Sequence, residues 1–105
     1  MNPVVRRRSY LRPGRLAPQA RSLRARAVTL APGGVMDWHS TEAREELVIA
    51  LAGCVVLEVA SASRRIGRLL RQGWCAFVPA RTRHRVVNRS RRRARYLYVT
   101  APITR

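Results

Sequence analysis

The sequence has few acidic residues and contains no lysine. Its 105 residues include 22 basic residues, all of them arginine, against five acidic ones, and the net charge is +17. Selection for positive charge alone would accept either basic residue, so the complete absence of lysine favours a codon bias of the genome. The alternative is an electrostatic surface for nucleic acid or another polyanion.

Other absences exclude whole classes of protein. No run of 18 apolar residues is present, which excludes a membrane-spanning helix. The two cysteines, Cys54 and Cys75, are too few for a disulfide scaffold or a four-cysteine zinc site. The length suits one compact domain, and a hydrophobic content of 47% is enough to build a core. These features predict a small single-domain enzyme or binding protein.

The arginines concentrate in two segments that contain no acid. Residues 1–26 hold eight arginines and residues 81–95 hold another eight, whereas residues 27–80 balance five arginines with five acids. We therefore expect a basic N-terminal arm over residues 1–22, with a possible edge strand near Tyr10 and Leu11, and one domain over residues 23–105. No aromatic residue interleaves residues 89–95 as a stacking platform would need, so the charge predicts only non-specific nucleic-acid binding.

The N-terminal arm resembles two targeting signals and fits neither. Arg7 and Arg8 begin a twin-arginine-like motif, but no apolar stretch follows them. Pro13 and Pro18 interrupt the amphipathic helix that a mitochondrial transit peptide needs. The prediction is a cytoplasmic protein with reduced thiols and no membrane association.

Short β segments separated by turn residues follow the arm. No segment has a sustained 3.6-residue apolar period. Many short strands with regularly spaced turns predict an all-β antiparallel sandwich or barrel. The expected strands cover residues 24–30, 46–52, 54–60, 66–70, 74–78, 83–87 and 96–100.

Alternation along residues 46–52 places Glu46 on one face together with Val48 and Ala50. The opposite face is also largely apolar, so both faces should be covered, and a second copy of the chain in a homodimer could cover one of them. Glu46 would then point into the barrel. A buried carboxylate costs several kcal/mol unless a partner satisfies it.

The two histidines and this glutamate occur within two spaced motifs. The first consists of Gly33, five residues, His39-Ser40-Thr41, four residues, Glu46, six residues and Gly53. The second consists of Gly73, five residues, Pro79-Ala80-Arg81, two residues, His84, three residues and Asn88. In this order and spacing they resemble the two motifs of the cupin family, and the resemblance extends over roughly residues 25–103.

The cupin resemblance implies a double-stranded β-helix, or jelly-roll barrel, with a divalent metal ion inside. It implies that His39, Glu46 and His84 are metal ligands, and it places Thr41 where the family has a further histidine. Because a hydroxyl is a weak ligand, Thr41 could at best bind the ion through water. Two imidazoles and a carboxylate form the ligand set of non-haem iron(II) sites, and manganese, nickel and zinc also accept it. The alternative is a barrel that has lost its metal and links the three side chains by hydrogen bonds.

Arg81 stands where the second motif has glycine, which predicts a positive φ at an arginine. Arg81 and Arg83 are candidates to hold a carboxylate or phosphate at the barrel mouth, the alternative being two solvated surface arginines. Trp38, next to His39, is a candidate wall of the pocket, with simple packing as the alternative.

Three functions remain open from the sequence. The first is a metal-dependent oxygenase or isomerase acting on a small, anionic molecule. The second is a non-catalytic protein that binds a small ligand such as a sugar or organic acid, with or without metal. The third is a scaffold whose arginine segments bind nucleic acid. Retention of His39, Glu46 and His84 favours the first two, and Thr41 favours the second over the first.

Overall fold

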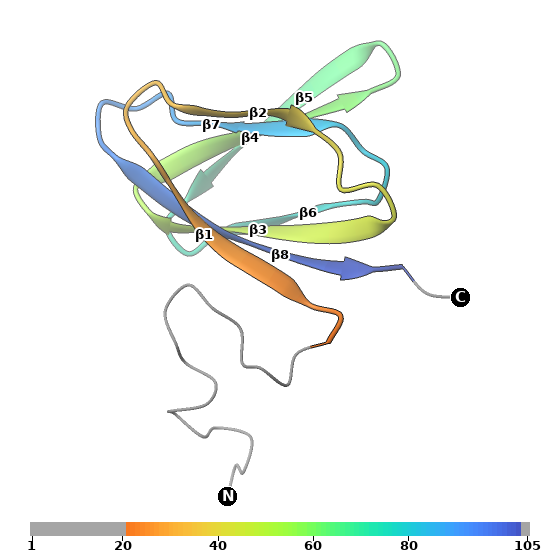
Figure 1. Cartoon of the computed structure of the whole chain (residues 1–105). Coiled ribbons are helices and arrows are strands. Elements are labelled where there is room, and N and C mark those ends of the chain that lie inside the picture. The colour runs from red at the N-terminus through yellow and green to blue at the C-terminus, as the bar shows by residue number, and fades with distance from the viewer. Residues whose placement is uncertain (1–20, 104–105) are drawn as a thin grey trace, which may run out of the picture.

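The computed structural model describes residues 21–103, which form eight β-strands and no helix (Figure 1). The predicted arm, with Tyr10 and Leu11, therefore lies almost wholly outside the described residues. Within the described range, no helix is long and apolar enough to cross a membrane. The strands are β1 Arg24–Leu30, β2 Val35–His39, β3 Arg44–Ala52, β4 Cys54–Ser61, β5 Arg64–Arg71, β6 Cys75–Val78, β7 His84–Val87 and β8 Ala94–Pro102.

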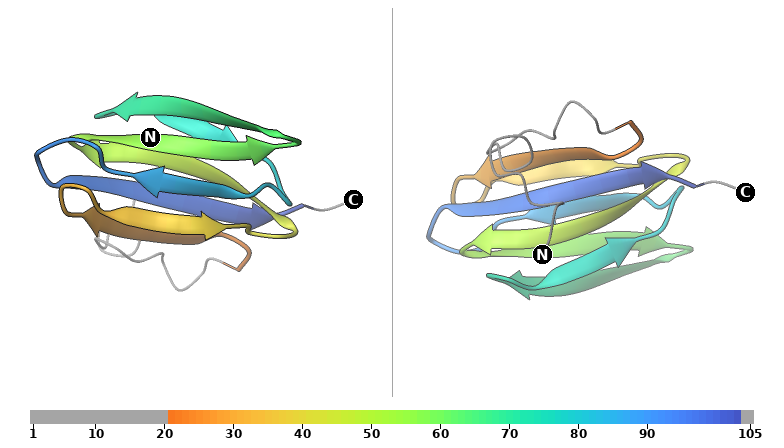
Figure 2. Two further views of the ribbon diagram at one scale, coloured as in Figure 1. Left: turned by 90° about the horizontal axis from the view of Figure 1, so that it is seen from above. Right: turned by 90° about the horizontal axis from the view of Figure 1, so that it is seen from below.

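The strands form two four-stranded antiparallel sheets that face each other. One sheet has the order β1-β8-β3-β6 and the other has the order β2-β7-β4-β5. Seen from above and below, β1 and β2 lie at one side of the sandwich and β5 and β6 at the other (Figure 2). The predicted all-β jelly roll is confirmed.

The sequence did not predict β2. Its pairing with β7 shifts register between Met36 and His39, which marks a β-bulge. Because a bulge adds a residue on one strand, both Met36 and His39 face the same side although they are three positions apart. The strict alternation that identifies a strand is therefore missing from this segment.

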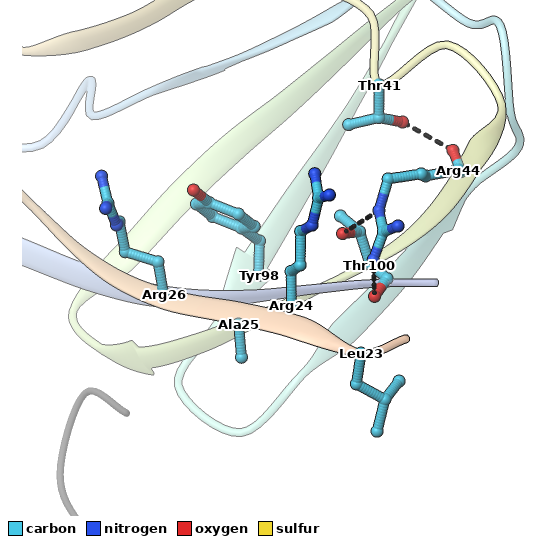
Figure 3. A pocket seen from close by; sticks show the side chains of 8 residues that line it. All are labelled: Leu23, Arg24, Ala25, Arg26, Thr41, Arg44, Tyr98 and Thr100. Carbon is cyan, nitrogen blue, oxygen red and sulfur yellow. Dashed lines mark hydrogen bonds between the residues drawn. The ribbon is translucent and has the colours of Figure 1, made fainter. Parts of the chain in front are cut away.

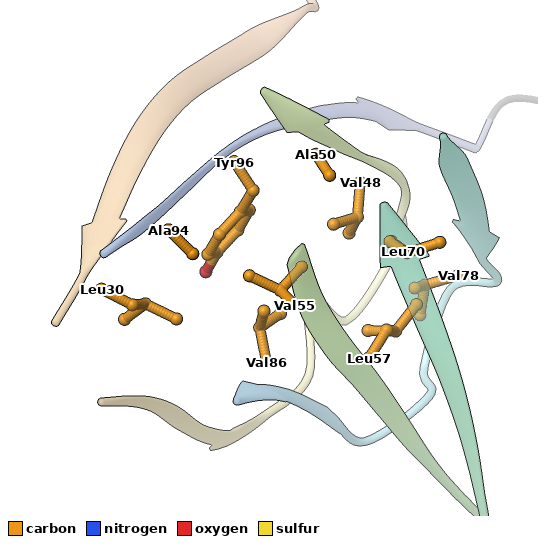
Figure 4. Close-up of a cluster of buried hydrophobic side chains, with 10 residues drawn as sticks. All are labelled: Leu30, Val48, Ala50, Val55, Leu57, Leu70, Val78, Val86, Ala94 and Tyr96. Atoms are coloured by element: carbon orange, nitrogen blue, oxygen red, sulfur yellow. The ribbon is translucent and has the colours of Figure 1, made fainter. Parts of the chain in front are cut away.

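The hydrophobic core fills one end of the space between the sheets (Figure 4). On β3, Glu46, Val48 and Ala50 are all buried whereas Glu45 is exposed, as the alternation predicted. The core cluster consists of Leu30, Val48, Ala50, Val55, Leu57, Leu70, Val78, Val86, Ala94 and Tyr96.

Toward the other end of the barrel the inner face becomes polar. On β3, the positions that precede Val48 on this face are Glu46 and Arg44, and both are paired with β8. Antiparallel register brings Thr100 of β8 directly opposite Glu46. The functional residues described below all lie at this polar end.

Asn88 of the second motif has a structural role. Its side chain is fully buried, and its amide Nδ2 donates to the carbonyls of Leu30, Ala31 and Arg92 at 3.1, 3.2 and 2.7 Å. Its backbone carbonyl accepts from the N–H of Gly33 at 2.8 Å. Asn88 thereby ties the β1–β2 turn to the β7–β8 loop.

Candidate metal centre

Three side chains of the sequence motifs meet between the two sheets. His39 ends β2, Glu46 lies on β3 and His84 begins β7, and one ligand atom from each lies within 4.8 Å of the others. His39 and His84 are register partners, and their ring centroids are 4.4 Å apart. The bulge in β2 is what turns His39 inward, opposite His84.

Backbone carbonyls orient both imidazoles. Nδ1 of His39 lies 2.7 Å from the carbonyl oxygen of Asp37, and Nδ1 of His84 lies 2.9 Å from that of Thr82. Since a carbonyl oxygen can only accept, each Nδ1 carries the proton and donates it. Each Nε2 is thus left as the ligand atom, in the arrangement that protein metal sites use to fix the tautomer of a ligating histidine.

Glu46 and His84 form a buried pair. Nε2 of His84 lies 3.1 Å from Oε1 of Glu46. Glu46 is 4% exposed and His84 is 0% exposed. Burial lowers the pKa of His84, but the hydrogen bonds to Glu46 and Thr82 and the charge of Glu46 together outweigh burial and raise that pKa. These two atoms, with Nε2 of His39, are the ones that a divalent cation would contact. This donor set fits a divalent metal ion.

Thr41 does not lie on a strand. Strand β2 ends at His39, and Thr41 belongs to the turn before β3. Its hydroxyl donates to the carbonyl of Arg44 at 2.6 Å, and its own carbonyl accepts from the N–H of Arg44 at 3.1 Å. Within residues 21–103, the group that could hold a metal ion thus has three members rather than four.

The other predicted binding residues lie apart from this group. Arg81 has a φ of 57°, the positive value that its place in the motif predicted, and its N–H donates to the carbonyl of Glu42 at 2.7 Å. The side chains of Arg81 and Arg83 are exposed. Trp38 is half-buried, and the guanidinium of Arg85 lies 5.0 Å from the centroid of its ring.

Sequence reasoning missed three other arginines. Arg24, Arg26 and Arg44 line an open cavity of about 540 Å³, whose other lining residues come from β1, β8 and the turn at Thr41 (Figure 3). The sequence could have indicated two of them. Arg24 and Arg26 are separated from the core residue Leu30 by an even number of positions on β1, so all three side chains lie on the same face of the strand.

Comparisons with known proteins agree with this architecture. Residues 26–100 match the family model described as Cupin domain. No curated protein matches the chain in sequence. The TT1209 protein of Thermus thermophilus is 34% identical with a TM-score of 0.70, over 80% of this chain and 76% of that one.

Two other solved structures are similar in fold at low identity. A recombinant oxalate oxidase in complex with glycolate is 18% identical with a TM-score of 0.73, over 77% of this chain and 42% of that one. The CENP-C cupin domain of Drosophila melanogaster is 11% identical with a TM-score of 0.68, over 73% of this chain and 59% of that one. The chain thus spans less than half the length of the oxalate oxidase, and these two similarities show the fold alone.

Proposed function

This chain belongs to the Cupin domain family, and from that membership we propose that it holds a divalent metal ion through His39, Glu46 and His84. Beside the ion it binds, or acts on, a small molecule. One observation carries the proposal, namely three ligand atoms within 4.8 Å of one another. Both histidines among them have Nδ1 already satisfied by a carbonyl.

The side chains divide the work of the site. His39 and His84 present neutral Nε2 atoms, and Glu46 supplies the negative charge that offsets a dication in a buried position. An ion bound there would supply Lewis-acid chemistry, and iron, manganese, nickel and zinc all accept this ligand set. Three protein ligands leave coordination positions open for a small molecule, as in catalytic rather than structural metal sites.

A metal-free binding or scaffold protein is the second candidate. The hydroxyl of Thr41 donates to the backbone carbonyl of Arg44. The His84–Glu46 hydrogen bond satisfies the buried carboxylate without an ion. Both observations fit a barrel that binds its ligand without metal chemistry.

The test is elemental analysis of protein purified without a histidine tag, before and after incubation with iron, manganese, nickel or zinc. We expect near-stoichiometric metal in the parent and its loss in the Glu46→Ala and His84→Ala variants. The Glu45→Ala variant is the matched control, since Glu45 is the exposed neighbour on β3. Absence of metal from every parent sample would rule out the metal-centred function and leave the second candidate.

We also propose that the chain forms a homodimer in the cytoplasm. The outer face of the β1-β8-β3-β6 sheet exposes Leu47, Leu51 and Phe77, which are 37%, 38% and 58% exposed. A contiguous apolar face of this kind fits a partner surface, and a second copy would bury it symmetrically. Cys54 and Cys75 are both free thiols, which fits a reducing compartment.

Sedimentation of the parent and a Phe77→Arg variant tests the dimer. The parent should sediment as a dimer and the variant as a monomer, because a buried arginine would lack a partner at the interface. An Ile66→Arg variant is the control, since Ile66 is exposed to a similar extent as Leu47, at 37%, but lies on the other sheet. A monomeric parent would exclude this interface.

A further inference from the structure

Three arginine side chains gather around one open cavity of the described residues. Arg24 and Arg26 project from β1 and Arg44 from β3 toward the space between the sheets, whereas Ala25 points the opposite way (Figure 3). Tyr98 of β8 also reaches into the cavity. Arg24 and Arg26 are exposed and Arg44 is half-buried, yet all three side chains line the same cavity.

Strand register brings this cluster next to Glu46. Thr100 of β8 pairs with Glu46 on one side and with Arg24 of β1 on the other. Residues directly opposite each other in a sheet share a face, so Arg24 points inward as Glu46 does. Neighbouring strands lie about 4.8 Å apart, which puts the backbone of Arg24 roughly 10 Å from that of Glu46. A small molecule can span that separation.

Within residues 21–103, no carboxylate neutralises these three arginines. The ion pairs of that range involve only Glu46, paired with His84, and Glu58, paired with two arginines on the outer face. The described residues that line the cavity include no acid. Burial, followed by the nearby charge of Arg24, lowers the pKa of Arg44.

Hydrogen bonds hold Arg44 in place before any ligand arrives. Its Nε–H donates to Oγ1 of Thr100 at 2.9 Å, and its Nη2 donates to the Thr100 carbonyl at 3.1 Å. Nη2 also donates to the carbonyl of Ser22. The second terminal nitrogen, Nη1, makes no hydrogen bond with the described residues and can donate to a ligand. A guanidinium held in this way loses little side-chain entropy when it binds an anion.

We infer that the cavity of Arg24, Arg26 and Arg44 is an anion subsite, which binds the remote carboxylate or phosphate group of a small ligand whose other end reaches the metal group. Guanidinium groups recognise both anions through paired, charge-assisted hydrogen bonds. The position of the ligand's second end rests on the proposed function, whereas the anion subsite needs no metal.

The test uses inorganic phosphate and succinate as probes for the two acid groups. Binding is measured by titration calorimetry on chelator-treated full-length protein at about 0.15 M ionic strength, which screens the general attraction of a basic protein. The R24Q/R26Q variant should bind about tenfold more weakly or worse, since two charge-assisted contacts are lost. The matched control is R91Q/R93Q, which removes the same charge from two exposed positions outside the cavity and should leave the affinity unchanged.

The outcomes separate three explanations. Saturable binding of either probe that only the cavity pair weakens supports the subsite, and the tighter probe identifies the acid group. Equal weakening by both pairs would show attraction to net charge and would overturn the inference. The absence of saturable binding to both probes would overturn it as well. An R24K/R26K variant keeps the charge but lacks the fork of donors, so we expect intermediate binding even if the glutamine variant is unstable.

Failure of the metal proposal can be distinguished from failure of the anion-subsite proposal. His39→Ala should lose metal yet bind phosphate or succinate like the chelator-treated parent, because it leaves the three arginines in place. R24Q/R26Q should keep the metal content of the parent. Anion binding, with no metal in any sample, would support the subsite and reject the metal centre. Metal binding by the parent, with no saturable anion binding, would support the metal centre and reject the subsite.

Discussion

Replacing Glu46 with glutamine should abolish the stabilisation of the fold by a divalent metal ion. The side chain belongs to a residue that is 4% exposed, and its Oε1 lies 3.1 Å from Nε2 of His84. An amide keeps the volume of the carboxylate and an acceptor oxygen for His84, so the variant should still fold. It removes the only negative charge among the three proposed ligands, and with it most of the attraction for a dication.

The size of the effect follows from mass action. An ion that binds only the folded state at a hundred times its Kd adds about 2.7 kcal/mol to the free energy of unfolding. In a domain of this length each kcal/mol moves Tm by about 4–8 °C. The parent should therefore melt roughly 10–20 °C higher with its preferred ion than with chelator. The Glu46→Gln variant should melt at nearly the same temperature in both conditions.

Thermal melts of tag-free protein with manganese, nickel, zinc or anaerobic iron(II) measure this difference. Glu45→Gln makes the same change of charge at the neighbouring exposed position, so it controls for loss of a surface acid. It should keep the full rise in Tm. The reasoning is refuted if no ion raises the Tm of the parent, or if Glu45→Gln loses the rise to the same extent as Glu46→Gln.

Three further predictions concern the scaffold. Asn88→Ala removes an amide that donates to three carbonyls, and urea unfolding should show a free energy of unfolding lower by about 3 kcal/mol. A decrease of less than about 1 kcal/mol would contradict the role of Asn88 in connecting the two loops. Gly53→Ala should cost about 1–3 kcal/mol, because φ is +68° and the new Cβ would lie 3.0 Å from a carbonyl oxygen; Gly73→Ala, with φ of +87° and nothing within 4 Å, should cost less. Hydrogen bonds from two arginines, and their charges, lower the pKa of Glu58, so its stabilisation is complete above its unfolded pKa and is lost as pH falls toward the folded one. Glu58→Gln should therefore cost about 1 kcal/mol at neutral pH, and melts of variant and parent should converge as pH falls below about 4, whereas a constant difference would exclude the ion pairs.

The strands with regular alternation could be predicted from the sequence, and the irregular one could not. Residues 46–52 alternate cleanly, and the inward direction of Glu46 follows from its parity with Val48. Strand β2 departs from that rule because its bulge lies between Met36 and His39.

Motif spacing indicated which residues meet, but contacts across the barrel needed the fold. His39, Glu46 and His84 were identified from spacing, and their ligand atoms do lie together. The pairing of each Nδ1 with a carbonyl two residues earlier depends on backbone geometry that spacing does not encode. Arg44 precedes the strand start expected at residue 46, so no face could be assigned to it.

Codon bias can explain the residue type of the cations, whereas function can explain their positions in the fold. A bias toward arginine codons explains why every cation is arginine, but it does not decide which face of a strand a cation occupies. On the outer surface the charges find ordinary partners, as Arg85 and Arg89 do with Glu58. Arg24 and Arg26 instead occupy the face of β1 that carries Leu30 at its other end, where nothing in residues 21–103 neutralises them. Repulsion between the like charges of these arginines opposes that placement. A bound anionic ligand would replace this repulsion with attraction between each guanidinium and the anion.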